Sequence, residues 1–156
     1  MRFVFIRHGH RVKGQDALTP AGRDAALAAG RFLREHGIAP ELLCHTDSRR
    51  TRETAQLVAQ VAAPDCALLD VGTGFAAGAS AQAVQQRIQG WLQQHGKPAQ
   101  VVAFVGHDPQ QVAVGRALAG GRIAVPKANR ACALVFDLEA GAWLLGPCFL
   151  GTPESP

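Results

Sequence analysis

The 156-residue sequence has no long apolar run. No stretch approaches the roughly 20 apolar residues that a membrane-spanning helix needs, so no membrane span and no membrane partner are expected. The first apolar run, Phe3–Ile6, is too short for the apolar core of a signal peptide and is followed at once by Arg7. We therefore expect a cytoplasmic protein.

The cysteines lack the spacing of a metal site. The four residues, Cys44, Cys66, Cys132 and Cys148, include no CxxC pair. Three of them lie in apolar stretches, where a reduced cysteine packs as a small hydrophobic side chain. The sequence thus predicts no metal and no other cofactor, and it favours a reducing compartment.

Charge of one sign is not in large excess. The formal net charge is +4, and no basic stripe is interleaved with aromatic residues, so nucleic acid is not expected as a partner. A phosphate-bearing partner would suit a mildly basic chain. An apolar fraction of 47% in a chain of this length predicts one globular domain, residues 1–150, followed by a frayed tail, residues 151–156. The oligomeric state is left open.

Short apolar runs alternate with amphipathic stretches. Strands are expected at Phe3–Ile6, Leu42–Cys44 and Val101–Val105, which do not alternate in polarity and should be buried on both faces. Two later runs, Ala131–Leu138 and Ala142–Leu150, are joined by a three-residue link that predicts an antiparallel hairpin. Helices are expected from Thr19 to near Gly37, from near Ser48, from Ser80 to Gly96, and from Asp108 to Gly121. This order predicts an α/β protein, a three-layer α/β/α sandwich with a mostly parallel sheet.

Charged and polar residues follow the three strands that should run parallel. Arg7 and His8 follow the first, Arg50 follows the second, and His107 follows the third. Because ligands bind beyond the carboxyl ends of such strands, we expect these side chains to converge. Arginine binds phosphate oxygens in pairs, and a neutral imidazole can attack phosphorus. Structural roles stay open for the same residues. His8 could be a strand-end histidine bonded to backbone, Arg50 a solvated helix residue, and His107 a core imidazole.

Four segments resemble the motifs of the histidine phosphatase superfamily, which has the phosphoglycerate mutase-like fold. They are FIRHG at 5–9 (an RHG signature), LTPAG at 18–22 (an LTxxG helix start), TDSRRTRETA at 46–55 (an S-D/P-x-x-R-T/A-x-E/Q-T-A segment) and VGHDP at 105–109 (a GHxP segment). The similarity spans residues 3 to about 115 in the family's order. The short chain and its closing hairpin resemble the small SixA-type phosphohistidine phosphatases.

The resemblance implies a role for each matched residue. His8 would be the nucleophile that becomes phosphorylated, Arg7 and Arg50 would clamp the phosphoryl oxygens, and His107 would be a second imidazole that contacts the phosphate. Gly9 would let the backbone turn close to that phosphate. The implied enzyme is a metal-independent phosphatase, acting first on phosphohistidine in a protein. A sugar, nucleotide or cofactor-precursor phosphate is the alternative substrate, and a non-catalytic phosphate-binding regulatory module is the alternative of another class.

The sequence departs from the family pattern at two places. His10 stands where an acidic residue is common, which makes His10 and its neighbour Arg11 candidate substrate contacts. Many relatives carry a glutamate as proton donor between the segments that match 46–55 and 105–109, but no such motif occurs here between Pro64 and Lys97. Asp108 is therefore the candidate proton donor, by resemblance to the HD pair of the acid-phosphatase branch. Asp108 before a proline is also the expected cap of the following helix, and this structural role is the stronger expectation. An enzyme without a positioned acid should favour a phosphoramidate, whose leaving group departs easily.

Overall fold

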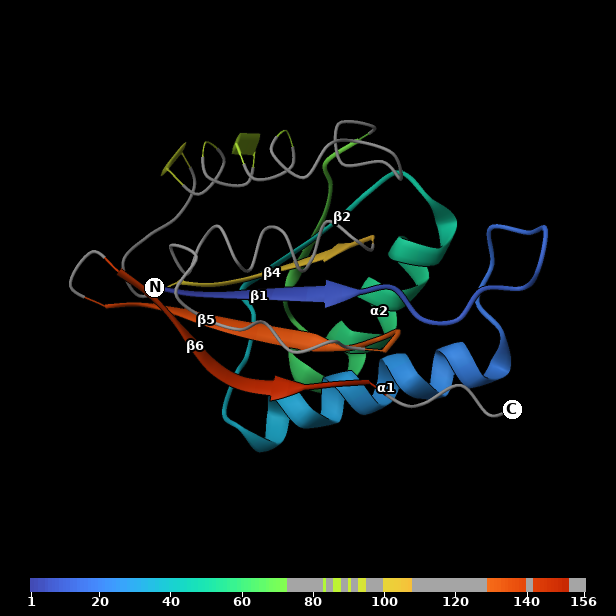
Figure 1. Ribbon diagram of the computed structural model, residues 1–156, viewed down its shortest axis with the longest axis horizontal. Helices are drawn as coiled ribbons and strands as arrows, with labels where there is room; N and C mark the ends of the chain where they lie inside the picture. The colour runs from blue at the N-terminus through green and yellow to red at the C-terminus, as the bar shows by residue number, and fades with distance from the viewer. Residues whose placement is uncertain are drawn as a thin grey trace.

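The computed structural model describes residues 1–72, 100–107, 129–139 and 142–151, together with residues 83, 86, 87, 90, 93 and 94. The described residues form a six-stranded sheet in the order β3-β2-β4-β1-β5-β6 (Figure 1). The strands are β1 (Arg2–Arg7), β2 (Leu42–His45), β3 (Ala67–Asp70), β4 (Val101–Gly106), β5 (Ala133–Glu139) and β6 (Ala142–Phe149).

The sheet combines a parallel half with an antiparallel edge. β1 pairs with β4, and β2 pairs with both β3 and β4, in parallel. β5 runs antiparallel to β1 and forms the hairpin with β6. The expected α/β fold with its antiparallel hairpin is confirmed. The sequence analysis missed β3, an edge strand whose four residues are all exposed and therefore show no buried pattern.

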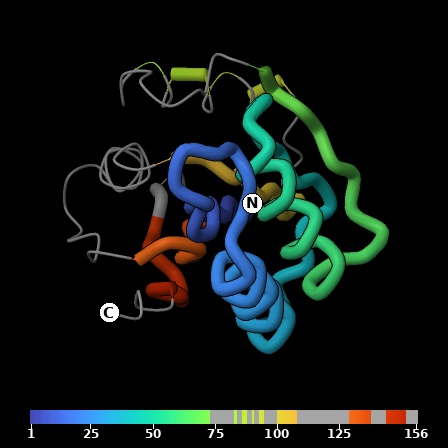
Figure 2. The backbone as a smooth tube through the Cα atoms, turned by 90° about the vertical axis from the view of Figure 1, so that its right-hand side faces the viewer, coloured from blue at the N-terminus to red at the C-terminus, as the bar shows by residue number. Residues whose placement is uncertain are grey.

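Two helices lie side by side on one face of the sheet (Figure 2). α1 (Pro20–Glu35) starts where the Thr19 hydroxyl accepts a hydrogen bond from the Gly22 amide at 2.9 Å, as the cap and the following proline predict. α2 (Arg49–Ala62) starts after Ser48, also as predicted. The side chain of Ser48, however, makes no capping hydrogen bond to the helix.

The central strand β1 is buried on both faces, as predicted. Val4 and Ile6 pack in the cluster that includes Leu33 of α1 and Val58 of α2. Phe3 and Phe5 belong to a second cluster with Phe104 of β4 and Phe136 of β5. Two hydrophobic clusters therefore hold the carboxyl end of β1 in a fixed position.

The other two expected helices lie mostly outside the described residues. Of the stretch 80–96, the described positions such as Arg87 and Gly90 are helical. The stretch 108–121, including Asp108, lies outside the described residues. None of the helices that the structure describes has both the length and the hydropathy of a membrane span.

Candidate active site

Backbone hydrogen bonds on both sides fix His8, which directly follows β1. The His8 amide donates to the Gly106 carbonyl at 3.1 Å, on the β4 side. The His8 carbonyl accepts from the Ala131 amide at 3.3 Å, just before β5. His8 as a whole is only 8% exposed. The end of a buried strand thus delivers this side chain to the carboxyl edge of the sheet, which Figure 2 views end-on.

The two ring nitrogens of His8 have different surroundings. Nδ1 lies 2.7 Å from the Gly9 carbonyl oxygen, which can only accept, so Nδ1 carries the proton. Nε2 then bears the lone pair and accepts from the Arg50 Nε at 3.3 Å. Burial lowers the pKa of His8 to about 3, and the nearby His107, Arg50 and Arg130 add to this effect by repulsion. His8 is therefore a neutral imidazole at neutral pH.

Arg50, in the first turn of α2, faces both imidazoles. Its Nε lies 3.3 Å from His8 Nε2, and its Nη2 lies 3.4 Å from His107 Nδ1. The two rings are edge to face with their centroids 5.2 Å apart. The expected convergence of His8, Arg50 and His107 is therefore observed.

His107 follows β4 and is held by a hydroxyl network. Its Nε2 lies 3.3 Å from the Thr46 Oγ1, which in turn lies 2.8 Å from the Thr51 Oγ1. Because Arg50 donates to Nδ1, the proton of the neutral ring belongs on Nε2, where Thr46 can accept it. Burial and then the charge of Arg50 lower the pKa of His107 to about 4.

Comparison with known proteins assigns this arrangement to a family. A family model, the histidine phosphatase superfamily (branch 1), matches residues 3–119. This chain belongs to the histidine phosphatase superfamily. The match confirms the expected family and the expected class of activity, phosphatase. A search of curated proteins finds no match.

Solved structures share the fold of this histidine phosphatase at low sequence identity. The protein histidine phosphatase SixA in complex with tungstate has 15% identity and a TM-score of 0.79, over 96% of this chain and 97% of the other. A putative SixA from Agrobacterium tumefaciens has 21% identity and a TM-score of 0.75, over 94% and 96%. A mycobacterial glucosyl-3-phosphoglycerate phosphatase has 19% identity and a TM-score of 0.67, over 93% and 96%.

Gly9 of this histidine phosphatase has a packing role that the motif alone does not reveal. Its amide donates to the Thr54 hydroxyl at 3.1 Å. A Cβ at this position would lie 2.4 Å from the Gly22 carbonyl oxygen, which is far too close. The glycine therefore allows α1 to approach β1, and its amide is already bonded within the protein.

Three other predicted residues, Arg7, His10 and Arg11, lie at or just after the end of β1. Arg7 ends β1 opposite Gly106, is half-buried, and has an Nε shielded from solvent. The His10 carbonyl accepts from the Thr19 amide at 2.9 Å, so the backbone of His10 is tied to the start of α1. Arg11 is exposed and pairs with Leu18 in an isolated bridge.

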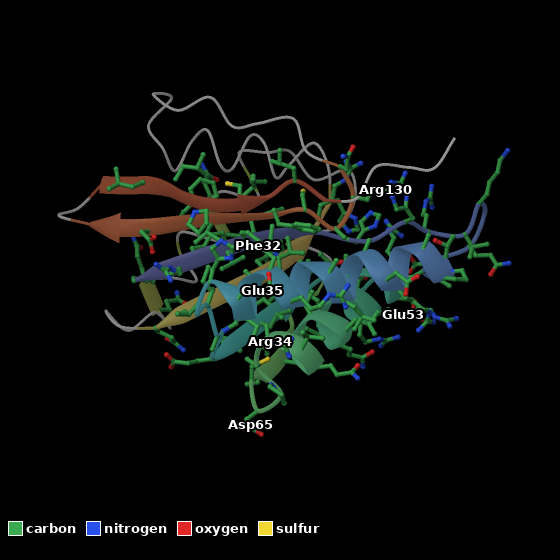
Figure 3. The ribbon with its side chains drawn as sticks, turned by 90° about the horizontal axis from the view of Figure 1, so that it is seen from below. Phe32, Arg34, Glu35, Glu53, Asp65 and Arg130 are labelled. Atoms are coloured by element: carbon green, nitrogen blue, oxygen red, sulfur yellow. The ribbon has the colours of Figure 1, made fainter. Side chains whose placement is uncertain are left out.

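Two residues of the site were missed by the sequence analysis. Asp16 accepts hydrogen bonds from the Arg49 amide at 2.7 Å and from the Arg50 guanidinium. Arg130 directly precedes Ala131, which is bonded to His8, and lies at the end of the molecule where β1 leaves the sheet (Figure 3). Neither belongs to a motif or a periodic pattern, so no local signal identifies them. Among the described residues, no group of three metal-binding side chains gathers at a possible metal site.

Proposed function

We propose that this phosphatase transfers the phosphoryl group of its substrate to Nε2 of His8 and then to water. The single observation that supports this is the tautomer: Nδ1 donates to Gly9, which leaves the Nε2 lone pair facing the cluster of Arg50 and His107. In the first step, Nε2 bonds to phosphorus and the bond to the leaving group breaks. In the second, a water oxygen bonds to phosphorus, the Nε2–P bond breaks, and inorganic phosphate leaves.

The arginines would bind the phosphoryl oxygens. The Nε–H and Nη2–H groups of Arg50 lie on one edge of the guanidinium, the edge that faces the imidazoles, and can bind two oxygens together. Arg7, at the end of the same strand as His8, would supply a second guanidinium, and His107 a second imidazole. Positioning and charge stabilisation of this kind supply most of the catalysis of phosphoryl transfer.

For the substrate, we propose phosphohistidine in a protein. The similar folds include both a protein histidine phosphatase and a sugar-phosphate phosphatase, so the fold does not decide between these classes. Leaving-group chemistry favours the phosphoramidate. Asp108, the candidate proton donor, lies outside the described residues, and Asp16, a described carboxylate that acts on His107 through its charge, is bonded to Arg50 and has a lowered pKa. Asp16 is therefore a poor acid.

A panel of substrates tests the proposal. The enzyme would be given a histidine-phosphorylated protein, an aryl phosphate and a sugar phosphate, with His8→Ala as the control. A positioned general acid contributes about 10²–10⁴-fold, so kcat/KM for the alkyl leaving group of the sugar phosphate should be lower by that order. Equal efficiency on the sugar phosphate would support the alternative, a small-molecule phosphomonoesterase. Phosphate binding by a wild type without any turnover would support the regulatory module.

The proposed setting is the cytoplasm. None of the four cysteines, all of which the structure describes, forms a disulfide, and Cys44 and Cys132 are buried. Such thiols suit a reducing compartment, which supports the proposal. His10 and Arg11 remain proposed substrate contacts at the rim of the site.

A further inference from the structure

Asp16 binds two consecutive residues of α2, Arg49 and Arg50. One carboxylate oxygen accepts the amide of Arg49, the first residue of α2, at 2.7 Å. The other accepts from Nη1 of the Arg50 guanidinium. Asp16 lies in the loop between β1 and α1, on the opposite side of Arg50 from the two imidazoles that its other nitrogens face. A single carboxylate thus holds both the start of α2 and the side chain that projects from its first turn.

The start of α2 needs this carboxylate because its own cap is otherwise engaged. The Ser48 hydroxyl bonds to the hydroxyls of Thr46 and Thr51 and makes no capping bond to the helix. The first amides of a helix need an acceptor from outside the helix, and a negative charge is favourable there. Asp16, which lies 33 positions before Arg49 in the chain, supplies both the acceptor and the negative charge.

The contact also sets the orientation of Arg50. A guanidinium is planar, so fixing Nη1 against Asp16 fixes the direction of the opposite edge. That edge carries Nε and Nη2, the atoms that lie 3.3 and 3.4 Å from the two imidazoles. The Arg50 side chain is 14% exposed and that of Asp16 is 44% exposed, so Asp16 is the partner nearer to solvent.

We propose that Asp16 is the positioning residue of the active site, which aims the Nε/Nη2 edge of Arg50 at the phosphoryl group on His8. The inference rests on the proposed function, because it assumes that Arg50 binds the phosphoryl oxygens. Without Asp16, the Arg50 side chain would regain rotamers that point to solvent. Its conformational entropy would then have to be lost each time it binds a phosphoryl group, which would raise the barrier to the reaction.

A second interpretation of the contact between Asp16 and Arg50 predicts the opposite effect on kcat. If Asp16 only neutralised Arg50, then removing this carboxylate would make the site more positive. Inorganic phosphate would bind more tightly, and kcat would be unchanged or higher. If Asp16 positions Arg50, removal lowers kcat, because the oriented edge matters most in the transition state.

The matched control is Glu53, which ties the same loop to the same helix. Its carboxylate accepts from the Leu18 amide at 2.9 Å and from Arg49 at 2.9 Å, and it also binds Arg23. These contacts stabilise the loop without touching the guanidinium of Arg50. Comparing Asp16→Ala with Glu53→Gln therefore separates the orientation of Arg50 from the stability of the loop.

The experiment measures kcat and KM on an aryl phosphate, inhibition by inorganic phosphate, and urea unfolding for wild type, Asp16→Ala, Asp16→Asn and Glu53→Gln. We expect kcat to fall about 10- to 100-fold in Asp16→Ala, the range that misplacement of a binding group produces. Asp16→Asn, which keeps one acceptor oxygen, should retain more activity, and Glu53→Gln should stay within about threefold of wild type. If Asp16→Ala does not fold, the comparison of Asp16→Asn with Glu53→Gln decides. Tighter phosphate inhibition with kcat unchanged would overturn the proposal.

A double-mutant cycle shows whether Asp16 acts through Arg50. In an Arg50→Lys background there is no planar edge to orient, so adding Asp16→Ala should lower kcat by less than threefold. An equal effect in both backgrounds would overturn the inference. If Arg50→Lys itself leaves kcat unchanged, the proposed role of Arg50 fails. If Arg50→Lys is impaired while Asp16→Ala is not, only the positioning role fails.

Discussion

Nδ1 of His8 lies 2.7 Å from the carbonyl oxygen of Gly9, the next residue in the chain. This contact within one motif determines which imidazole nitrogen can react. The ring donates through Nδ1 and keeps a lone pair on Nε2, on the side of Arg50. The glycine also lets α1 pack closely, since a Cβ at Gly9 would collide with the Gly22 carbonyl. One short segment therefore orients the proposed nucleophile and fixes the helix beside it.

We predict that His8 and His107 stay neutral far below the usual pKa of histidine. Burial lowers the pKa of His8 to about 3 and that of His107 to about 4 in the free enzyme. Histidine NMR between pH 8 and pH 6 should therefore show no protonation of either ring, with assignments from His8→Asn and His107→Asn. Titration of His8 near pH 6.5 would show that the imidazole is not held in the neutral form.

The same shifts predict how stability depends on pH. In the unfolded chain both histidines bind a proton near pH 6.5. The folded protein resists protonation, so the unfolded state holds more protons between that pH and about 3 to 4. The free energy of unfolding should thus be highest above pH 6.5 and fall as the pH drops. Urea unfolding at pH 7, 5 and 4 checks this, and His8→Asn should weaken the dependence. An unchanged pH dependence in that variant would count against the shift at His8.

We predict that Gly9→Ala destabilises the protein through a steric clash. The added Cβ would lie 2.4 Å from the Gly22 carbonyl oxygen, so either α1 or the segment after β1 must move. Overpacking of this kind costs about 1–3 kcal/mol, measurable by urea unfolding, and the shift should also lower kcat. Gly90→Ala is the control, because a Cβ there would meet none of the described atoms outside its own helix within 4 Å. Equal stability of the two variants would contradict the close approach.

We predict that the hydroxyl of Thr54 links the nucleophile segment to α2. Its Oγ1 accepts from the Gly9 amide at 3.1 Å and donates to the Arg50 carbonyl at 2.8 Å. Thr54→Val keeps the shape but leaves the buried Gly9 amide without an acceptor, which costs about 1–3 kcal/mol of stability. Thr54→Ser keeps the hydroxyl and should stay near wild type in stability and in kcat. A valine variant as stable and active as the serine variant would show that the link is unimportant.

Local patterns in the sequence predict much of the fold and of the site. The apolar run Phe3–Ile6 and the Thr19 cap are local signals, and the structure has both β1 and the start of α1 there. The convergence of Arg50 and His107 on His8 follows from parallel strand order. The contact of Asp16 with Arg50 joins residues 34 positions apart and carries no periodic or motif signal, so it is visible only in three dimensions. β3 was missed because an exposed edge strand lacks a buried pattern.

Trapping of the phosphorylated enzyme tests the central claim most directly. Wild type and His8→Ala would be mixed with a phosphate-labelled aryl substrate, quenched in alkali within the first turnover, and digested for mass spectrometry. The account predicts an acid-labile phosphoryl group on His8 of the wild type, formed and lost at rates consistent with kcat, and no label or turnover in His8→Ala. Turnover by His8→Ala, or a wild type that turns over with the label on another residue, would contradict it.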